Sequence, residues 1–440
     1  MFGYHLRLGL KSLKRNPVLT ALMIGAIGLG VGVCLTTLNV YHLVSGNPIA
    51  ARNDVLYAVQ LDNWDPQDPW DDDNAQMPPT EVTHREAMAI LASDIPDRKV
   101  VMHKGAFVLA PGDENSEVKP YIVELRLTTG DFFPMFATPF KYGSGWDRAA
   151  DASAEAVIVL SKKSNDTVFG GEDSVGKMVK LDDREYRVVG VLDEWRPVPK
   201  FYDLNNGSFD EIEEGFIPFS RSEMLEVTSA GNTNCWKPEP INSYREFLNS
   251  ECVWIQAWVE LGSADKVAAF QSFLDGYVTE QKKTGRFQRP MNNKLNRPDQ
   301  WLEANEVVAD DNRVLLGISF MFLAVCLLNT VGLLLAKFSG AAARVSLHRA
   351  LGASRSMIFR QHLIEVSIIG IAGGLLGLLL GYLGLLSLRQ LYNGYDDLTR
   401  LNWDVGFMAM GIALLAGIVA GLYPTWRIMR LQPAPYLKTQ

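Results

Sequence analysis

The stretch VLTALMIGAIGLGVGVCLTTLNVYHLV, residues 18–44, contains no Asp, Glu, Lys or Arg and is the first of four long apolar runs. The other three are Val314–Ala336, Leu363–Leu388 and Val405–Pro424. A helix crosses the hydrocarbon core of a membrane with roughly 20 apolar residues, and each run reaches that length. Residues 46–312, between the first two runs, are mostly polar. The sequence therefore predicts a membrane protein with four transmembrane helices and one large domain inserted between the first and the second.

The alternative for the first run is a cleavable signal peptide. Such a peptide has an apolar core of about 7–15 residues and a small-residue cleavage site after it. Here the run is longer, and it ends in Asn39-Val-Tyr-His-Leu-Val44 without such a site. We therefore expect a retained membrane anchor.

The charges of the chain predict its orientation. Residues 1–45 and 313–440 together carry 15 Lys and Arg against 4 acidic residues, a formal charge of +11. Because the whole chain carries −8, residues 46–312 carry −19. Segments rich in Lys and Arg stay on the cytoplasmic side of a membrane. We expect a bacterial inner-membrane protein with both termini in the cytoplasm, an acidic periplasmic domain, lipid as a partner and no nucleic acid.

The runs and charges together also predict the domain boundaries. They indicate a cytoplasmic amphipathic helix at 1–17, transmembrane helices at 18–45, 313–337, 363–388 and 405–426, a periplasmic α+β domain at 46–312, a cytoplasmic segment at 338–362, a periplasmic loop at 389–404 and a cytoplasmic tail at 427–440.

The four cysteines fit this placement. Cys34 and Cys326 lie in apolar runs and are expected to be small buried side chains. Cys235 and Cys252 lie in the exported domain, on the oxidising side of the membrane, which favours a disulfide. Half of a zinc site is the alternative, but the two histidines of the domain lie far upstream in the sequence. We expect a disulfide and no metal.

Patterns of strands and helices alternate within the inserted domain. Residues 197–250 are rich in Pro, Asn, Asp and Glu and predict an irregular insertion. A helix is expected to continue from Trp301 through Asn312 into the second transmembrane run. The other expected elements are helices at His84–Leu91 and Ala264–Lys283, strands at Lys99–Leu109, Tyr121–Leu127, Ala156–Leu160 and Val253–Leu261, and a hairpin of Met178–Leu181 with Tyr186–Leu192.

One stretch resembles a phosphate-binding loop but lacks its chemistry. Gly171-Glu-Asp-Ser-Val-Gly-Lys177 fits the first seven positions of the pattern, yet Met178 replaces the hydroxyl residue that would hold magnesium. A helix should follow such a loop to bind phosphate at its N-terminus. A strand-turn-strand pattern follows here, so we expect the glycines to form a turn.

Glycines recur at a spacing of four in the apolar runs. Rows of small residues let membrane helices approach closely, although glycine is also frequent in such helices in general. The sustained row in the third run favours packing, either within the chain or against a second copy. The glycines expected at such contacts are Gly28, Gly32, Gly373, Gly377, Gly381, Gly417 and Gly421.

Charged residues are missing from the centres of the four runs, where Asn329 is the main polar side chain. Ion-coupled carriers place such residues inside their transmembrane helices as relays. The sequence therefore disfavours a proton- or ion-coupled carrier.

The segment after the second run carries the most specific resemblance. Ala343-Arg-Val-Ser-Leu-His-Arg-Ala-Leu-Gly-Ala-Ser354, followed by Met357-Ile-Phe-Arg-Gln-His-Leu-Ile-Glu365, resembles the signature R-x-E-I-G-[ILV]-[RL]-[RK]-A-[LI]-G-A-[ST] of MacB/FtsX-type ABC transporter permeases. Leu8–Pro17, Phe169–Leu192 and Gly421–Leu431 are also similar to parts of that family. The resemblance covers both ends, all four runs and at least half of the inserted domain.

The resemblance implies a permease of the mechanotransmission type. In that family, ATP binding in cytoplasmic ATPase subunits moves the periplasmic domains of a permease dimer. This chain would then have no catalytic residue or cofactor of its own, and ATP and Mg would belong to a separate ATPase partner. The alternative for the basic, apolar segment is a helix on lipid headgroups. The residues expected to contact the ATPase are Arg344, Arg349, Leu351, Gly352, Ala353, Ser354, Arg355 and Glu365.

Two positions depart from the family pattern. Arg344 stands where the family has Glu, and Ser346 stands where it has Gly. This reversal suggests a divergent subunit beside a more typical permease, with a second copy of this chain as the alternative.

The resemblance implies efflux of a drug, peptide or other periplasmic substrate, with a membrane-fusion adaptor as a further partner. A lipoprotein-releasing permease and an FtsX-like activator of a periplasmic hydrolase are the alternatives.

Overall fold

The computed structural model describes residues 13, 15–113, 116–307, 310–391 and 403–429. The predicted N-terminal helix (1–17), the loop at 389–404 and the tail at 427–440 fall largely outside these residues. The chain divides into two units, one formed by 1–45 with 308–440 and the other by 46–307.

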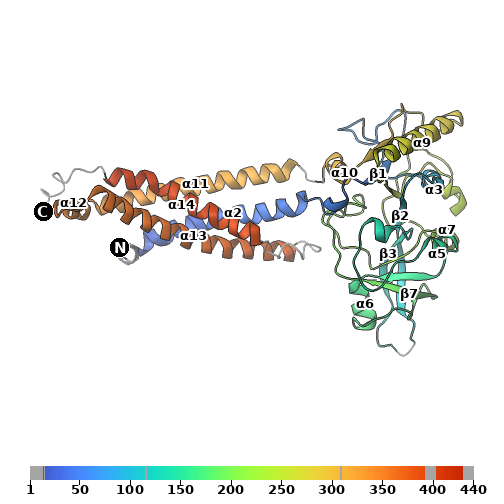
Figure 1. Cartoon of the computed structure of the whole chain (residues 1–440), viewed down its shortest axis with the longest axis horizontal. Coiled ribbons are helices and arrows are strands. Elements are labelled where there is room, and N and C mark those ends of the chain that lie inside the picture. Colours follow the sequence, from blue (N-terminus) through green and yellow to red (C-terminus); the bar gives the residue numbers. More distant parts are fainter. Residues whose placement is uncertain (1–12, 14, 114–115, 308–309, 392–402, 430–440) are drawn as a thin grey trace. The chain divides into compact units, whose positions relative to one another are not determined.

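Long helices form the first unit. They are α2 (Pro17–Ser45), α11 (Asp310–Gly340), α13 (Arg355–Leu391) and α14 (Trp403–Met429), with the short α12 (Ala342–Ala350) between α11 and α13. Among the described residues, α2, α11 and α13 are long and apolar enough to cross a membrane. The fourth predicted span, 405–426, lies in α14. Figure 1 shows the four long helices running side by side.

The core of this unit contains apolar side chains from several helices. Its buried members are Leu13, Met23, Ile27, Val31, Cys34 and Leu35 from the N-terminal part of the unit, Leu323, Leu334 and Phe338 from α11, Val345 from α12, and Ile358, Val366 and Ile369 from α13. Cys34 and Cys326 are both buried and free, as the sequence predicts.

The second unit is built on a sheet of ten described strands. Their order is β10-β1-β9-β2-β3-β8-β5-β7-β4, and β6 pairs with β2 and β7. The strands are β1 (Leu56–Gln60), β2 (Arg98–Pro111), β3 (Tyr121–Thr128), β4 (Phe140–Gly143), β5 (Val157–Leu160), β6 (Met178–Leu181), β7 (Arg184–Leu192), β8 (Gly215–Pro218), β9 (Gln256–Glu260) and β10 (Lys294–Asn296).

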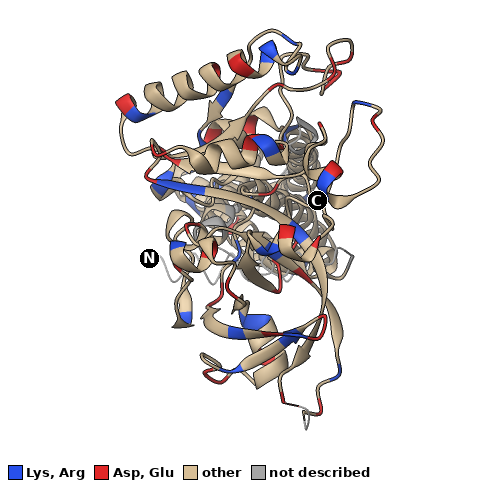
Figure 2. Cartoon of the chain, turned by 90° about the vertical axis from the view of Figure 1, so that its right-hand side faces the viewer, with Lys and Arg blue, Asp and Glu red and all other residues tan. Residues whose placement is uncertain are grey.

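Helices connect the strands of this domain, and acidic and basic residues occur along both its helices and its loops (Figure 2). The helices are η1 (Ala50–Arg52), α3 (His84–Ala92), α4 (Phe132–Met135), α5 (Arg148–Ala152), α6 (Lys162–Phe169), α7 (Arg221–Leu225), α8 (Tyr244–Leu248), α9 (Ala264–Lys283) and α10 (Pro298–Ala304).

Strand β5, which lies between β8 and β7, shows why an unbroken apolar run forms here. Val157 and Val159 pack into one buried cluster, whereas Ile158 and Leu160 pack into another. Because successive side chains of a strand point to opposite faces, both faces of the sheet are covered at this point. A strand in that position needs apolar residues at every site, as the sequence predicted for Ala156–Leu160.

The first and last strands of the domain are neighbours. β1 pairs antiparallel with β10, and the backbone N–H of Asp299 in α10 donates to the side-chain oxygen of Asn53 at 3.0 Å. The two chain ends that leave this unit therefore start from adjacent elements.

Two predictions about this domain are wrong. The helix expected to run from Trp301 through Asn312 ends at Ala304, because Glu306 adopts a left-handed conformation (φ 47°) and the Val307 N–H returns to the Leu302 carbonyl. This is the hydrogen-bond pattern of a helix stop that glycine usually forms.

The second wrong prediction concerns the segment 197–250. It is not wholly irregular, since β8 lies inside the sheet between β3 and β5.

The phosphate-loop-like stretch is a turn. Gly171 and Gly176 have φ values of 83° and 85°, and β6 follows them rather than a helix. Positive φ explains why glycine occupies both positions.

Candidate functional site

The segment after α11 folds as a short helix and a tight turn. Gly352, two residues after α12, has a φ of 96°, which glycine adopts readily and other residues do not. The Ala353 N–H donates to the His348 carbonyl at 3.0 Å and closes the turn. The Ser354 hydroxyl accepts from the Met357 N–H at 3.2 Å and caps the start of α13. The sequence Leu-Gly-Ala-Ser thus ends one helix and begins the next.

The apolar residues of this segment divide into two groups. Val345 and Ile358 are buried in the helical core. Leu347 and Met357 are exposed, and the side chain of Leu351 is 77% exposed. Arginines flank the exposed group, and Ser354 is exposed beside it. Because the sequence predicts an ATPase contact here, we call this exposed group, together with the turn residues and arginines beside it, the coupling surface. It comprises Leu347, Arg349, Leu351, Gly352, Ala353, Ser354, Arg355 and Met357.

Two predicted coupling residues behave differently. The backbone of Arg344 lies in α12, but its side chain lies outside the described part of the structure. Glu365 is only 1% exposed and lies inside the helical unit. We therefore assign Glu365 to the support of the segment and not to direct contact with a partner.

Glu365 forms a buried ion pair between α11 and α13. Its carboxylate lies 2.6 Å from the ammonium of Lys337, and both side chains are 3% exposed or less. His362 Nδ1 lies 3.3 Å from the second carboxylate oxygen, and the His362 ring packs against Phe338 at 4.4 Å between centroids. A buried charge needs an opposite charge nearby, so this pair fastens the two helices that α12 connects.

The predicted glycines lie where helices meet within the chain. A Cβ atom added at any of them would lie about 3 Å or less from an atom of another helix. Gly28 faces Leu376, Gly32 faces Leu380, Gly373 faces Ile27, Gly377 faces Val31, Gly381 faces Leu35, Gly417 faces Gly370 and Gly421 faces Val366. Of the two alternatives left by the sequence, packing within the chain is the one that the structure shows.

Gly377→Leu is expected to destabilise the helical unit by about 1–3 kcal/mol, because extra atoms in a close-packed contact force neighbours apart. A Cβ at this position would lie 2.7 Å from Val31 Cγ1 and 3.2 Å from the Gly28 carbonyl oxygen. The measurement is the unfolding temperature of the purified chain in detergent. Gly332→Leu in α11 is the matched control, because no atom lies within 4 Å of its added Cβ. Equal losses in the two variants would contradict the close contact.

A second buried network lies in the domain. The guanidinium of Arg126 in β3 forms ion pairs with Asp203 and Glu213, and none of the three side chains is more than 1% exposed. Lys200 lies 3.4 Å from Glu213, and the Tyr202 hydroxyl donates to the same carboxylate at 3.0 Å. Four of these residues come from the segment 197–250, which this network ties to the sheet.

The electrostatics of this network are balanced. Burial alone would raise the pKa of Glu213, but the nearby charges of Arg126 and Lys200 hold it below its ordinary value. Burial raises the pKa of Glu81 to about 8, so that this carboxyl is mainly protonated at neutral pH. Gln256 links Glu81 to Arg126. Its side-chain N–H donates to the Glu81 carboxyl at 2.6 Å, and its side-chain oxygen accepts from the Arg126 guanidinium at 3.2 Å.

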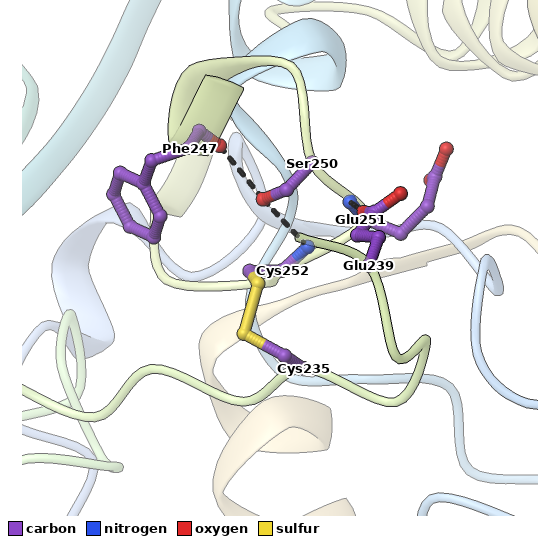
Figure 3. The surroundings of a disulfide bond; sticks show 6 residues. All are labelled: Cys235, Glu239, Phe247, Ser250, Glu251 and Cys252. Carbon is purple, nitrogen blue, oxygen red and sulfur yellow. Dashed lines mark hydrogen bonds between the residues drawn. A yellow bond between two sulfur atoms is a disulfide. The ribbon is translucent and has the colours of Figure 1, made fainter. Parts of the chain in front are cut away.

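Cys235, inside the segment 197–250, forms a disulfide with Cys252, which lies two residues after that segment (Figure 3). The Ser250 hydroxyl donates to the Phe247 carbonyl at 2.7 Å and accepts from the Cys252 N–H at 3.3 Å. The backbone of Asn234 pairs with that of Val253 beside the bond. The disulfide therefore holds the end of the insertion against the residues that lead into β9. No cluster of metal-ligating side chains occurs among the residues that the structure describes.

Sequence reasoning did not single out Lys337 or Arg126. Lys337 enters the sequence analysis only as one of the 15 Lys and Arg in residues 1–45 and 313–440. The sequence does contain one signal for this pair. Lys337 directly follows the second apolar run, and Glu365 lies near the start of the third run, so the same connecting segment separates them. Arg126 lies two residues after Glu124 and therefore on the same face of the predicted strand. Two charged residues on one face predict that this face is exposed to solvent and not buried.

Comparison with known proteins places these features in a family. A family model for the MacB-like periplasmic core domain matches residues 20–274, more than half of the chain. The chain belongs to the MacB/FtsX-type family of ABC transporter permeases. A second model, for the FtsX-like permease C-terminal region, matches residues 316–433. The coupling surface and the Lys337–Glu365 pair of this MacB/FtsX-type permease both lie within that second match.

Individual relatives are distant. The permease is 21% identical over 338 residues to the macrolide export ATP-binding/permease protein MacB of Syntrophobacter fumaroxidans, with 71% of this chain and 46% of the relative covered. It is 23% identical over 366 residues to the pyoverdine export ATP-binding/permease protein PvdT of Pseudomonas aeruginosa, with 81% and 49% covered. The chain thus spans about half the length of these curated relatives.

A similar solved structure is the periplasmic region of MacB from Actinobacillus actinomycetemcomitans. The TM-score is 0.37 at 12% sequence identity, with 59% of this chain and 95% of that chain covered.

Proposed function

We propose that this MacB/FtsX-type permease works by mechanotransmission. A separate cytoplasmic ATPase would bind the coupling surface, and its ATP-driven movement would pass through α11 and α13 to the domain formed by residues 46–307. The observation that carries this proposal is the coupling surface itself. Leu351 is 77% exposed at a glycine turn and is flanked by arginines, whereas the neighbouring Val345 and Ile358 are buried in the helical core.

The inner face of the segment supports the same function. Val345 and Ile358 attach the segment to the helical core, and the Lys337–Glu365 pair joins the helices on its two sides. A push on α12 would therefore move α11 and α13 together rather than bend a loose linker. Close packing of glycines between α2 and α13 would pass the movement on to α2.

The names of relatives support efflux as the purpose of that movement. MacB and PvdT are described as export proteins that combine ATP-binding and permease functions. We propose that this permease likewise serves export of a drug, peptide or other periplasmic substrate.

Its partners would be an ATPase and a second permease, with the reversed charge of Arg344 favouring a related, more typical subunit over a second copy. A membrane-fusion adaptor would be a further partner.

For the orientation, we propose that both termini lie in the cytoplasm and that α14 is the fourth span. The positive charge of residues 1–45 and 313–440 and the negative charge of the inserted domain support this arrangement. The domain would then lie in the oxidising periplasm.

The state of Cys235 and Cys252 tests this orientation. We expect mass spectrometry of non-reduced peptides from cells to show the two residues linked. The disulfide closes a loop across a sequence separation of 17. It should stabilise the domain by on the order of 3 kcal/mol by restricting the unfolded chain, so that Cys235→Ser lowers the unfolding temperature. Reducing agent should then lower the unfolding temperature of the wild type but not of the variant. Two freely alkylated thiols in the cellular protein would contradict a periplasmic domain.

Gly352→Glu tests the coupling surface. A bulky anion at the turn should reduce the ATPase activity that copurifies with the permease in mild detergent by about tenfold or more, since a charge buried in an interface without a partner costs several kcal/mol. Insertion and expression should match those of Gly352→Ala, because no atom lies within 4 Å of a Cβ at this position and both variants carry the same backbone strain at φ 96°.

Gly352→Ala is the matched control for this experiment. It introduces the same backbone strain at φ 96° without added charge, and we expect it to retain most of the copurifying activity. If Gly352→Glu retained full ATPase binding and ATP-dependent transport, the segment would be a helix on lipid headgroups, and the proposed coupling would be wrong.

A further inference from the structure

A pocket of about 440 Å³ lies in the domain between α3, α5 and α7. Its volume falls in the range of roughly 300–1,000 Å³ that is typical of small-molecule sites. Apolar side chains form much of its wall, among them Met88, Leu91 and Phe219. Met88 is 45% exposed, so part of this apolar wall is open to solvent. The pocket therefore offers an apolar surface that a ligand could cover.

The charged groups of the pocket do not cancel. Arg148 pairs with Asp131 at 2.9 Å. The ammonium of Lys99 donates to two backbone carbonyls, those of Leu91 at 2.7 Å and Ser93 at 2.6 Å. The bonds of Lys99 to neutral carbonyls leave its charge in place, so the lining carries two cations, Lys99 and Arg148, against the three carboxylates of Asp131, Asp151 and Glu223.

Two of these carboxylates, Asp151 and Glu223, lie beyond ion-pair distance of the cations that the structure describes. Asp151 accepts hydrogen bonds from the Gly130 N–H at 2.7 Å and the Trp146 indole at 2.6 Å, and Glu223 is exposed on α7. Neither has an ion-pair partner in the part of the chain that the structure describes. Burial lowers the pKa of His84, which lines the same pocket, and so disfavours its charged form, although the charge of Glu223 acts in the opposite direction.

We propose that this pocket binds a small primary amine with an aromatic or branched apolar body. The ammonium group would lie beside Glu223, and the apolar body would contact Phe219 and Met88. An amine satisfies the unpaired carboxylate, whereas a carboxylic acid of the same shape would be repelled by it. The proposal concerns the domain alone and does not depend on docking of an ATPase to the coupling surface.

A matched pair of probes tests the charge preference. The full chain in phosphatidylcholine nanodiscs is titrated with 2-phenylethylamine and with 3-phenylpropionate, and binding is followed by saturation-transfer NMR. The two probes have the same ring and similar length but opposite charge. We expect the amine to bind at least about fivefold more tightly, the effect of one ion pair at a partly exposed site. Equal binding of the two probes would overturn the proposal.

Variants locate the binding in the pocket. Glu223→Gln should weaken binding of the amine about fivefold, whereas Glu226→Gln, which removes the same charge outside the lining, should leave it unchanged. Ala152→Trp should fill the pocket from its exposed edge and abolish binding without lowering the unfolding temperature. Amine binding that is unaffected by Glu223→Gln, or reduced equally by Glu226→Gln, would show that the amine binds elsewhere.

Discussion

Glu365→Ala is expected to destabilise the helical unit by about 3–5 kcal/mol, because it leaves the ammonium of Lys337 buried without its counter-ion. The ammonium lies 2.6 Å from the carboxylate and is shielded from water in the described structure. We expect a lower unfolding temperature in detergent and a lower yield of inserted protein. ATP-dependent transport should fall further than yield, since the pair holds together the two helices that flank α12.

The charge-reversed double variant Lys337→Glu with Glu365→Lys is the control for this prediction. It restores opposite charges at the same two positions and should recover a large part of the lost stability. Glu365→Gln should fall between, because it keeps a hydrogen-bond acceptor but removes the charge. If Glu365→Ala were as stable as the wild type, the carboxylate would not be a structural partner of Lys337.

Arg126→Met should destabilise the domain by a similar amount, about 3–5 kcal/mol. The substitution leaves Asp203 and Glu213 buried, with Lys200 as the remaining cation at 3.4 Å from Glu213. Unfolding of the full chain is followed by tryptophan fluorescence, because Trp195 stacks on Tyr202 next to this network at 5.6 Å between ring centroids.

Arg187→Met is the matched control in the same sheet. Arg187 pairs with Glu155 at 2.7 Å, but both side chains are nearly half exposed. Exposed pairs contribute about 1 kcal/mol or less, so this variant should unfold close to the wild-type temperature. Similar losses in the two variants would show that burial does not determine the importance of Arg126.

The helices and regular strands were largely predictable because their patterns are local. The helix predicted at Ala264–Lys283 has those bounds in the structure, with Ser263 as its N-cap. The hairpin of Met178–Leu181 with the strand after it is also present, joined at Asp182 and Asp183, both of which have positive φ. Period-two and period-3.6 patterns carry this information within a short stretch of sequence.

The errors have non-local causes. β8 is only four residues long and follows acidic residues, and it becomes a strand because β3 and β5 pair with it on either side. The end of α10 depends on Glu306 in a conformation that usually marks glycine, so its residue type gave no signal. Arg126 and its partners come from distant parts of the chain, and only the folded sheet brings them together.

The local fold of the candidate site was predictable from the sequence, but the exposure of its side chains was not. The turn at Gly352 and the positions of the helix-packing glycines follow from local sequence. Whether a side chain of the segment points outward, as Leu351 does, or inward, as Glu365 does, depends on the neighbouring helices. No single helical pattern in the segment separates the two.

The adjacency of β1 and β10 has a consequence for the modular use of this architecture. Because the domain starts and finishes at neighbouring strands, it can be inserted between two consecutive helices without requiring them to lie far apart. Replacement of the domain by another with equally close ends would preserve the connections at both sides. Recombination could thus exchange the inserted domain while leaving the helical unit and its turn at Gly352 intact.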